Sequence, residues 1–581
     1  MIKTIIGIIL LLVPLLSINF FKDKKKGFFY VLTLLIFFHV FVALLTQFFG
    51  IFSYTLVLVI NIVFCIGVLT KTNWRSLKPN IKGKIDWIFI FVVIVLFIEL
   101  FSVHYNYSGK IVNINGVEEA KNMKYVYPYY SDEWSAISFI KYSINSGKLP
   151  FVNPLWYNSY FPNPEFVFHS FLSELFLLLN LNPLTNYSLF ALFFGILICL
   201  FVYFVLNLNK IGRFPSAVAA LSIPYIVNSA NLPGIWYLIP LILGIICLLL
   251  SFIFISLKET KMVLFTSFLT LIFYPPLFVL SFASLMFYIL SLEFDKKDKM
   301  KYIIIYILIC FIVSIIISFK IIFGGSEGFD FFNYLFSKIY YLTFTSEAIP
   351  DYSLWKVVPL WSGIFAVLGF LSLIKEKELW KKSWLIAPIV VGLIYWGLYS
   401  SVFWRFIIEY QRVVVATSVL IVIFSGFGIQ YSLNFIKNKF VINNKVLTFI
   451  FAIVLILFLL FSFFYTARDN WASLKLYSNG KKISDPAPPA NNYLIEEDLV
   501  LFKDIKNRSF IAPSWKGLVI GSATGNYPLD SKQSTITNYL LDYNNFINSN
   551  CNLKIQLAKN YGVDYAYSKE FECEKFELIG K

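Results

Sequence analysis

Residues 186–208 read NYSLFALFFGILICLFVYFVLNL, a run of 23 positions without a charged side chain, and Lys210 and Arg213 follow it. About 20 consecutive apolar residues form a helix long enough to cross the hydrocarbon core of a bilayer. Comparable runs recur along the 581 residues, which are 58% hydrophobic, 19% aromatic and 14% charged. Soluble domains average about 45–50% apolar and about 25% charged residues. The composition excludes a soluble, disordered, collagen-like, small disulfide-rich or nucleic-acid-binding protein, and predicts an all-α polytopic membrane protein.

The apolar runs predict about 14 transmembrane helices. They lie near residues 5–20, 27–48, 51–70, 86–103, 186–208, 214–228, 236–256, 262–274, 276–291, 302–319, 354–374, 385–400, 412–431 and 447–466. Pro275 and Pro276 interrupt the apolar stretch 262–291, so we expect two short helices there that return to the same side. Counting residues 166–181 as a span would move Lys210 and Arg213 to the other side. An interfacial helix is therefore expected at 166–181.

The charges predict the orientation of these helices. The net charge of +16, from 49 Lys and Arg against 33 Asp and Glu, would suggest an anionic partner in a soluble protein. Here the basic residues cluster in alternate connections, at 22–26, 71–84, 210–213, 258–261, 296–301, 375–382 and 437–445. By the positive-inside rule these connections are cytoplasmic. We therefore expect a multi-pass protein of the cell membrane with both termini outside.

Three regions follow from this topology. Residues 1–85 hold extra N-terminal transmembrane helices, and residues 86–466 form a transmembrane core with outer loops at 104–185 and 320–353. Residues 467–581 begin with a polar linker that contains DPAPP at 485–489. Beyond it, helical patterns at 494–505 and 554–561 alternate with strand-like segments at 509–512, 517–521 and 563–567. This alternation predicts a small extracytoplasmic α/β domain.

The cysteines and histidines point to structure more than to a cofactor. Four of the six cysteines fall in predicted spans, where small apolar packing is expected. Cys551 and Cys573 lie in the outer C-terminal region, where oxidation allows a disulfide. The three histidines are scattered, and no nucleotide-binding or serine-hydrolase motif is present. We expect no cofactor, and the sequence offers no support for a divalent metal.

The first outer loop contains the segment YVYPYYSDEW at 125–134, which an amphipathic helix follows. Asp132 and Glu133 are adjacent carboxylates among aromatic residues at the predicted membrane boundary. Two interpretations stand side by side. An Asp before a helix is an ordinary N-cap and aromatics at this depth form an interfacial belt. Alternatively, carboxylates in such surroundings are suited to general base chemistry.

This arrangement resembles the GT-C glycosyltransferases, in which a span enters a long outer loop with an acidic pair, a helix, Gly–Pro and Pro-flanked turns and an interfacial helix. In pattern it is similar to the protein O-mannosyltransferase and aminoarabinose transferase branches, which use polyprenyl-phosphate sugars. Further matching segments are NPEFVFH at 163–169, FWR at 403–405 leading through Arg412 to GFG at 426–428, IAPSWKG at 511–517 and GVDYAY at 562–567.

The resemblance implies a GT-C-like fold and an inverting transfer of a sugar from a polyprenyl-phosphate donor. The acceptor would be a protein, lipid or glycan at the outer membrane face. The family's loop aspartate maps onto Asp132, which would take the proton from the acceptor hydroxyl. Glu133 is the second catalytic candidate, or a residue that orients the acceptor.

The remaining site candidates are substrate-binding residues. Arg412 and Arg405 suit the leaving phosphate, and seven residues apart they would share one face of a helix; each is equally compatible with a snorkelling cation. Glu99 lies near the outer end of its span, where an ionisable group is costly, and pairing with His104 is its alternative. His169 lies in the segment that resembles the family's juxtamembrane helix. His39, inside the second span, is expected to be a hydrogen-bonded packing residue.

Other functions remain open. A catalytically silent GT-C-like scaffold has the same sequence features. An envelope polysaccharide ligase or polymerase should carry essential Arg and His residues in a large late outer loop, but the 401–411 connection is short. A secondary transporter should show internal repeats and charges near the bilayer midplane, whereas the acidic residues here concentrate in outer loops.

Overall fold

The computed structural model describes residues 2–71, 86–226, 234–292, 300–312, 354–402, 410–440 and 494–567, with short gaps at 106, 114–115, 124–126, 129, 162, 376–378, 495 and 532–540 and isolated positions near 446–457 and 573–576. The predicted outer loop 320–353, most of the predicted span 447–466 and the linker at 467–493 lie outside the described residues.

The N-terminal part is built from long apolar helices. It comprises α1 (Ile2–Leu12), which continues as the 3₁₀ helix η1 (Val13–Phe20), then α2 (Lys24–Phe48), α3 (Tyr54–Lys71) and α4 (Trp87–Tyr105). Asp23 begins α2, because its side chain accepts hydrogen bonds from the backbone N–H groups of Lys25 and Lys26.

The segment between α4 and the next long helix carries the first predicted outer loop. It contains the antiparallel pair β1 (Tyr107–Asn113) and β2 (Gly116–Met123), then α5 (Ser131–Ser146), the short antiparallel pair β3 (Val152–Asn153) and β4 (Ser159–Tyr160), and α6 (Phe166–Leu178). The hairpin of β1 and β2 was not predicted from the sequence. A helix at α6 was predicted, and the structure confirms it.

The central part continues as a helical bundle. Its elements are α7 (Pro183–Leu208), α8 (Arg213–Ser222), η3 (Ile223–Tyr225), α9 (Pro240–Ser256), α10 (Thr260–Phe273), η4 (Pro275–Leu277), α11 (Phe278–Ser291), a helix at Met300–Ile312, α14 (Leu354–Val357), α15 (Leu360–Lys375), η5 (Trp380–Lys382), α16 (Ser383–Val402) and α17 (Tyr410–Phe440). The break at Pro275 and Pro276 is confirmed by η4, because proline cannot donate the backbone hydrogen bond that would continue α10.

The C-terminal segment contains α19 (Glu496–Leu501), β5 (Ser509–Ile511), α20 (Ser514–Thr524), β6 (Tyr527–Pro528), α21 (Tyr543–Asn548), α22 (Cys551–Tyr561) and β7 (Tyr565–Ala566). Its three strands are parallel in the order β6-β5-β7. The prediction of a strand at 517–521 is wrong, because these residues lie in α20. Parallel neighbours such as β5 and β6 need a crossover connection, and α20 supplies it.

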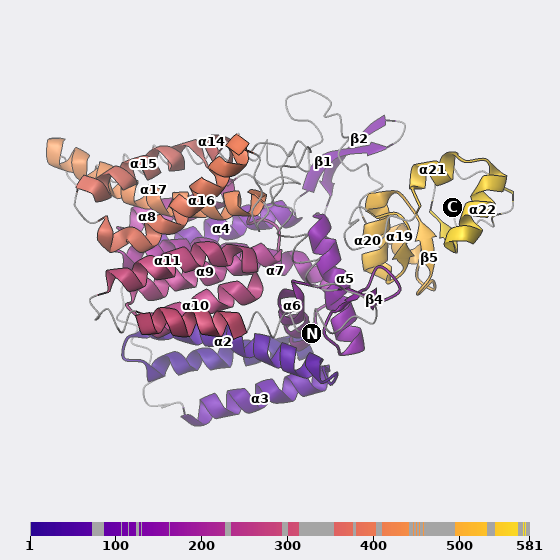
Figure 1. Cartoon of the computed structure of the whole chain (residues 1–581), viewed down its shortest axis with the longest axis horizontal. Coiled ribbons are helices and arrows are strands. Elements are labelled where there is room, and N and C mark those ends of the chain that lie inside the picture. The colour runs from indigo at the N-terminus through magenta and orange to yellow at the C-terminus, as the bar shows by residue number, and fades with distance from the viewer. Residues whose placement is uncertain are drawn as a thin grey trace.

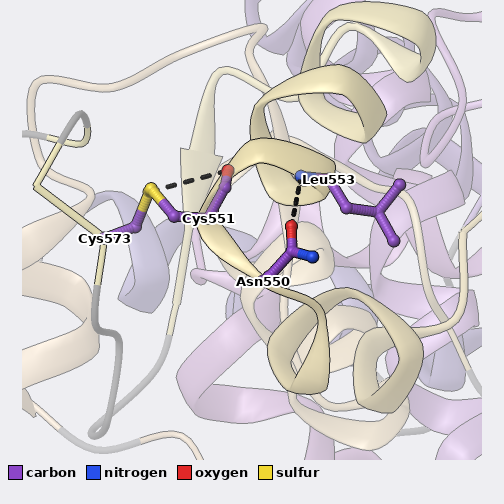
Figure 2. Close-up of a disulfide and its surroundings, with 4 residues drawn as sticks. All are labelled: Asn550, Cys551, Leu553 and Cys573. Atoms are coloured by element: carbon purple, nitrogen blue, oxygen red, sulfur yellow. Dashed lines mark hydrogen bonds between the residues drawn. A yellow bond between two sulfur atoms is a disulfide. The ribbon is translucent and has the colours of Figure 1, made fainter.

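A disulfide joins Cys551, at the start of α22, to Cys573. Figure 2 shows this bond beside the N-cap of α22, where the Asn550 side chain accepts a hydrogen bond from the backbone N–H of Leu553 at 2.9 Å. The predicted disulfide is therefore confirmed. The other four cysteines, Cys65, Cys199, Cys247 and Cys310, are free and buried, as expected for packing residues.

The bundle has two distinct ends. At one end, which we call the α5 end, lie α5, α6, the N-terminus and the C-terminal segment (Figure 1, right). At the opposite end, the basic end, Lys26 forms an ion pair with Glu259, and Arg213 Nε lies 3.3 Å from Asp86 Oδ2. One continuous apolar core runs through α4, α7, α9 and α17 and reaches α5, α6 and α20. This shared core holds the C-terminal segment against α5 and α6.

The apolar helices fit a membrane protein. Within the described residues, six helices are long and apolar enough to cross a membrane, and seven shorter apolar helices accompany them. The predicted span 214–228 is shorter than expected, since α8 ends at Ser222 and a single 3₁₀ turn follows. The number of spans and the side that each end faces stay predictions.

Candidate functional site

The candidate site begins where α5 begins. The chain is extended at Tyr130, and the backbone N–H groups of Glu133 and Trp134 then donate to the Tyr130 carbonyl oxygen. The helix ends at Gly147, whose φ of +70° is a left-handed conformation that favours glycine. These two boundaries place Asp132 in the first helical turn, close to the core of the bundle.

Asp132 and Arg412 meet although 280 positions separate them in the chain. Nη2 of Arg412 donates to Oδ2 of Asp132 at 2.8 Å. Arg412 lies in the first turn of α17, which packs against α8, α15 and α16. The side chains are 13% exposed for Arg412 and 30% exposed for Asp132. The structure thus brings together the two residues that the sequence analysis named for base and phosphate chemistry.

Glu133 occupies a different environment from its neighbour. It is 2% exposed. Its Oε1 accepts a hydrogen bond from the backbone N–H of Leu238 at 2.9 Å, and its Oε2 accepts one from the backbone N–H of Tyr130 at 3.4 Å. The rings of Tyr130 and Tyr237 also stack, with centroids 4.8 Å apart. Glu133 therefore fastens the start of α5 to the segment that leads into α9.

Glu99 lies in α4, toward its α5 end. The hydroxyl of Tyr225, in η3, donates to Glu99 Oε1 at 2.7 Å. Pairing with His104 was the structural alternative expected from the sequence, and the contact with Tyr225 was not predicted. His104 itself is 2% exposed. Glu99 thus connects α4 to the 3₁₀ turn η3 that follows α8, and a contact with substrate stays a prediction.

His169 is buried in α6. Its Nδ1 lies 3.0 Å from Nδ2 of Asn163, and its ring stacks on Phe139 of α5 with centroids 4.8 Å apart. Asn163 Nδ2 also donates to the carbonyl oxygen of Pro150 at 3.0 Å. His169 therefore holds α6 against α5 and the intervening turns. Arg405 lies outside the described residues, so its place in the site stays a prediction.

Two polar features on α5 and α6 were not predicted from the sequence. Glu174 of α6 binds His39 of α2, with 3.0 Å between Oε1 and Nδ1, and accepts a hydrogen bond from Asn61 Nδ2 of α3 at 3.2 Å. His39 is thus a hydrogen-bonded packing residue, as predicted. Lys141 of α5 donates to the carbonyl oxygens of Ser522 and Ala523 in α20, and burial lowers its pKa to about 8. The only available sequence signal for each was an ionisable residue inside an apolar or amphipathic helix.

Among the described residues, no group of three or more His, Cys, Asp and Glu side chains is placed to hold a metal ion. Asp132 and Arg412 instead form an acid and a guanidinium side by side. Such a pair can accept a proton and bind a phosphate oxygen.

No family model matches the chain, and no curated protein matches it. Two crystal structures of the oligosaccharyltransferase of Archaeoglobus fulgidus are similar in structure. One is tethered by a disulfide to an acceptor peptide that contains the NVT sequon, with 11% identity and a TM-score of 0.47, and the other is the apo form, with 12% identity and a TM-score of 0.45. Each similarity covers 83% of this chain and 69% of the oligosaccharyltransferase chain.

Proposed function

We propose that this chain is a GT-C-type glycosyltransferase that moves a sugar from a polyprenyl-phosphate donor to an acceptor hydroxyl at the outer membrane face. The observation that carries the proposal is the contact between Asp132 and Arg412, 2.8 Å long, at the junction of the outer loop and the helical bundle. A base and a phosphate-binding cation are the two groups that this reaction requires at one point.

The proposed reaction is a displacement at the anomeric carbon of the donor sugar. The acceptor oxygen forms the new glycosidic bond while the bond from the anomeric carbon to the phosphate oxygen breaks. Asp132 takes the proton that the acceptor hydroxyl loses, and the polyprenyl phosphate leaves with the bonding electron pair. Arg412 binds the phosphate as negative charge develops on it. A single displacement of this kind inverts the anomeric configuration.

The ion pair has a specific place in this proposal. Without substrate, Asp132 and Arg412 satisfy each other's charge. A bound donor offers Arg412 a phosphate, which can take two of its N–H donors at once. Asp132 is then released toward the acceptor. Donor binding and exposure of the base are thereby coupled through one side chain.

We infer that Glu133 acts by positioning rather than as the base. Its carboxylate is 2% exposed and accepts hydrogen bonds from two backbone N–H groups. A base must lie within hydrogen-bonding distance of the proton that it removes. Both carboxylate oxygens of Glu133 instead accept hydrogen bonds from backbone N–H groups. Glu99 and His169 are each held by a protein side chain too, which favours a supporting role for both.

The test is sugar transfer by the purified full-length protein, with synthetic polyprenyl-phosphate sugars as donors. We expect Asp132→Asn to lower kcat about 100-fold or more, because the amide cannot accept the proton. Arg412→Gln should raise KM for the donor and lower kcat. Asp504→Asn is the matched control, because it removes the same charge from an exposed carboxylate in the C-terminal segment.

The outcomes separate the alternatives. Wild-type rates in a folded Asp132→Asn protein would remove Asp132 from the role of base. No transfer by the wild type with any donor would favour the silent scaffold or the transporter. Transfer of a whole polymer, but of no single sugar, would favour the ligase or polymerase.

A further inference from the structure

A cavity of about 590 Å³ lies between α5 and the C-terminal segment. Its walls come from α5, from the turn after β3, from the residues before β5, and from the last turn of α20 through the start of β6. Two lysines, Lys141 and Lys506, line it, and no Asp or Glu is among its lining residues. The walls therefore favour a ligand with negative charge.

Hydrogen bonds to α20 fix the side chain of Lys141 in the wall of this cavity. Its ammonium group donates to the carbonyl oxygens of Ser522 at 3.2 Å and Ala523 at 2.6 Å, in the last turn of α20. An ammonium has three donors, so these two contacts leave one N–H for a ligand. Both partners are neutral carbonyls at the negative end of a helix dipole. Lys141 thus brings a positive charge that no described carboxylate neutralises.

The other wall groups suit a hydroxyl-rich ligand. Ser522 is 2% exposed, and its hydroxyl has no hydrogen-bond partner among the described residues. The amide side chains of Asn145 and Asn507 add both donors and acceptors to the lining. Tyr527 also lines the cavity, and its ring lies 4.3 Å from that of the half-exposed Tyr157. Aromatic faces of this kind pack against apolar faces while their hydroxyls bond to polar groups.

We propose that this cavity binds a saccharide that carries a phosphate or carboxylate group, with Lys141 and Lys506 on the anionic group and the hydroxyl and amide side chains on the sugar. The site is separate from the one around Asp132. Lys141 follows Asp132 by nine residues on α5, which is about 13 Å along the helix axis and half a turn around it. The inference concerns binding and does not depend on the proposed glycosyl transfer.

Binding to the purified full-length protein tests the inference without any donor. The probes are glucose 6-phosphate, glucose and inorganic phosphate. We expect glucose 6-phosphate to bind, and glucose and phosphate each to bind at least about tenfold more weakly, since each makes only part of the contacts. Affinity for glucose 6-phosphate should fall as the pH rises through about 8, where Lys141 loses its proton.

Matched variants locate the ligand. Lys506→Glu should weaken binding at least about tenfold, because it places a carboxylate beside the anion. Lys503→Glu makes the same charge change at an exposed position that does not line the cavity, and an effect within about twofold is expected. Asp132→Asn should also leave binding unchanged, which separates this site from the catalytic one.

Four results would overturn the proposal. Equal affinity in Lys506→Glu and Lys503→Glu would place the ligand elsewhere. If inorganic phosphate bound as tightly as glucose 6-phosphate, the sugar would contribute nothing to binding. Competition by short-chain phosphatidylglycerol at equal concentration would identify a lipid phosphate as the ligand. Loss of binding in Asp132→Asn would assign it to the catalytic site.

Discussion

Two neighbouring carboxylates, Asp132 and Glu133, have different tasks because a helix separates adjacent side chains by about 100°. Asp132 points to Arg412 with 30% of its side chain exposed, while Glu133 is 2% exposed and holds backbone N–H groups. Only one of them can face a substrate. The Asp–Glu pair therefore consists of one carboxylate that is open to the proposed reaction and one that anchors the start of α5.

Asp530 carries a clear pH dependence at the residue scale. It follows β6 and is 3% exposed. Burial raises the pKa of its carboxyl to about 6, although the backbone N–H of Tyr543 donates to Oδ2 at 2.9 Å and opposes the shift. The folded state thus binds a proton that the unfolded chain has already released, so stability falls as the pH rises from 3.8 to about 6.

We predict that Asp530→Asn stabilises the C-terminal segment at pH 7.5 by about 2 kcal/mol, because it removes a buried charge and keeps an oxygen for the Tyr543 N–H. Below pH 4 the effect should vanish, since the wild-type carboxyl is then neutral. Hydrogen exchange of residues 541–548 measures the difference, with Asp504→Asn as the control. Equal protection in wild type and Asp530→Asn at pH 7.5 would contradict the prediction.

At the scale of elements, α15 and α17 pack backbone to backbone. A Cβ added to Gly428 of α17 would lie 1.8 Å from the carbonyl oxygen of Phe365, and one added to Gly369 of α15 would lie 2.4 Å from that of Phe424. Small residues allow such close approach of helices in membranes. Because α17 also carries Arg412, this contact helps to place the residue that we propose binds the phosphate.

Gly428→Ala should therefore destabilise the bundle by about 1–3 kcal/mol, since α15 must move away to admit the methyl group. Gly397→Ala is a matched control, because a Cβ at Gly397 meets no described atom within 4 Å. The thermal midpoints of the two purified variants test this. If Gly397→Ala loses as much stability as Gly428→Ala, the cost does not come from helix contact.

Most helices of the bundle could be predicted from the sequence. The length of an apolar run and the charges that flank it are local features, and they are enough to indicate a helix. The sequence also indicated Asp132 and Arg412 as members of one site. Their contact, the bond between Glu133 and Leu238 and the network of His39, Asn61 and Glu174 could not be predicted, since each depends on how distant helices pack. The wrong prediction of a strand at 517–521 has the same origin. The apolar run of α20 is compatible with a strand or a helix, and it is the parallel pairing of β5 and β6 that requires a helix between them.

For the whole molecule, the basic connections and the candidate site lie at opposite ends of the bundle. The described basic connections meet at one end, where Lys26 contacts Glu259 and Lys382 contacts Asn209. The α5 end carries the candidate site and the disulfide between Cys551 and Cys573. The positive-inside rule predicts that the basic end is cytoplasmic. A disulfide is stable in an oxidising compartment, which independently predicts that the α5 end faces outward.

Cysteine labelling in whole cells tests this orientation. Asp504→Cys, in the C-terminal segment, and Lys261→Cys, at the start of α10, are both exposed positions. A membrane-impermeant maleimide should label Asp504→Cys in intact cells, and Lys261→Cys only after permeabilisation. The wild type is a suitable background, because four of its cysteines are buried and two form the disulfide. The reverse labelling pattern would place Asp132 and Arg412 on the cytoplasmic side, where the proposed use of a lipid-linked donor at the outer face could not hold.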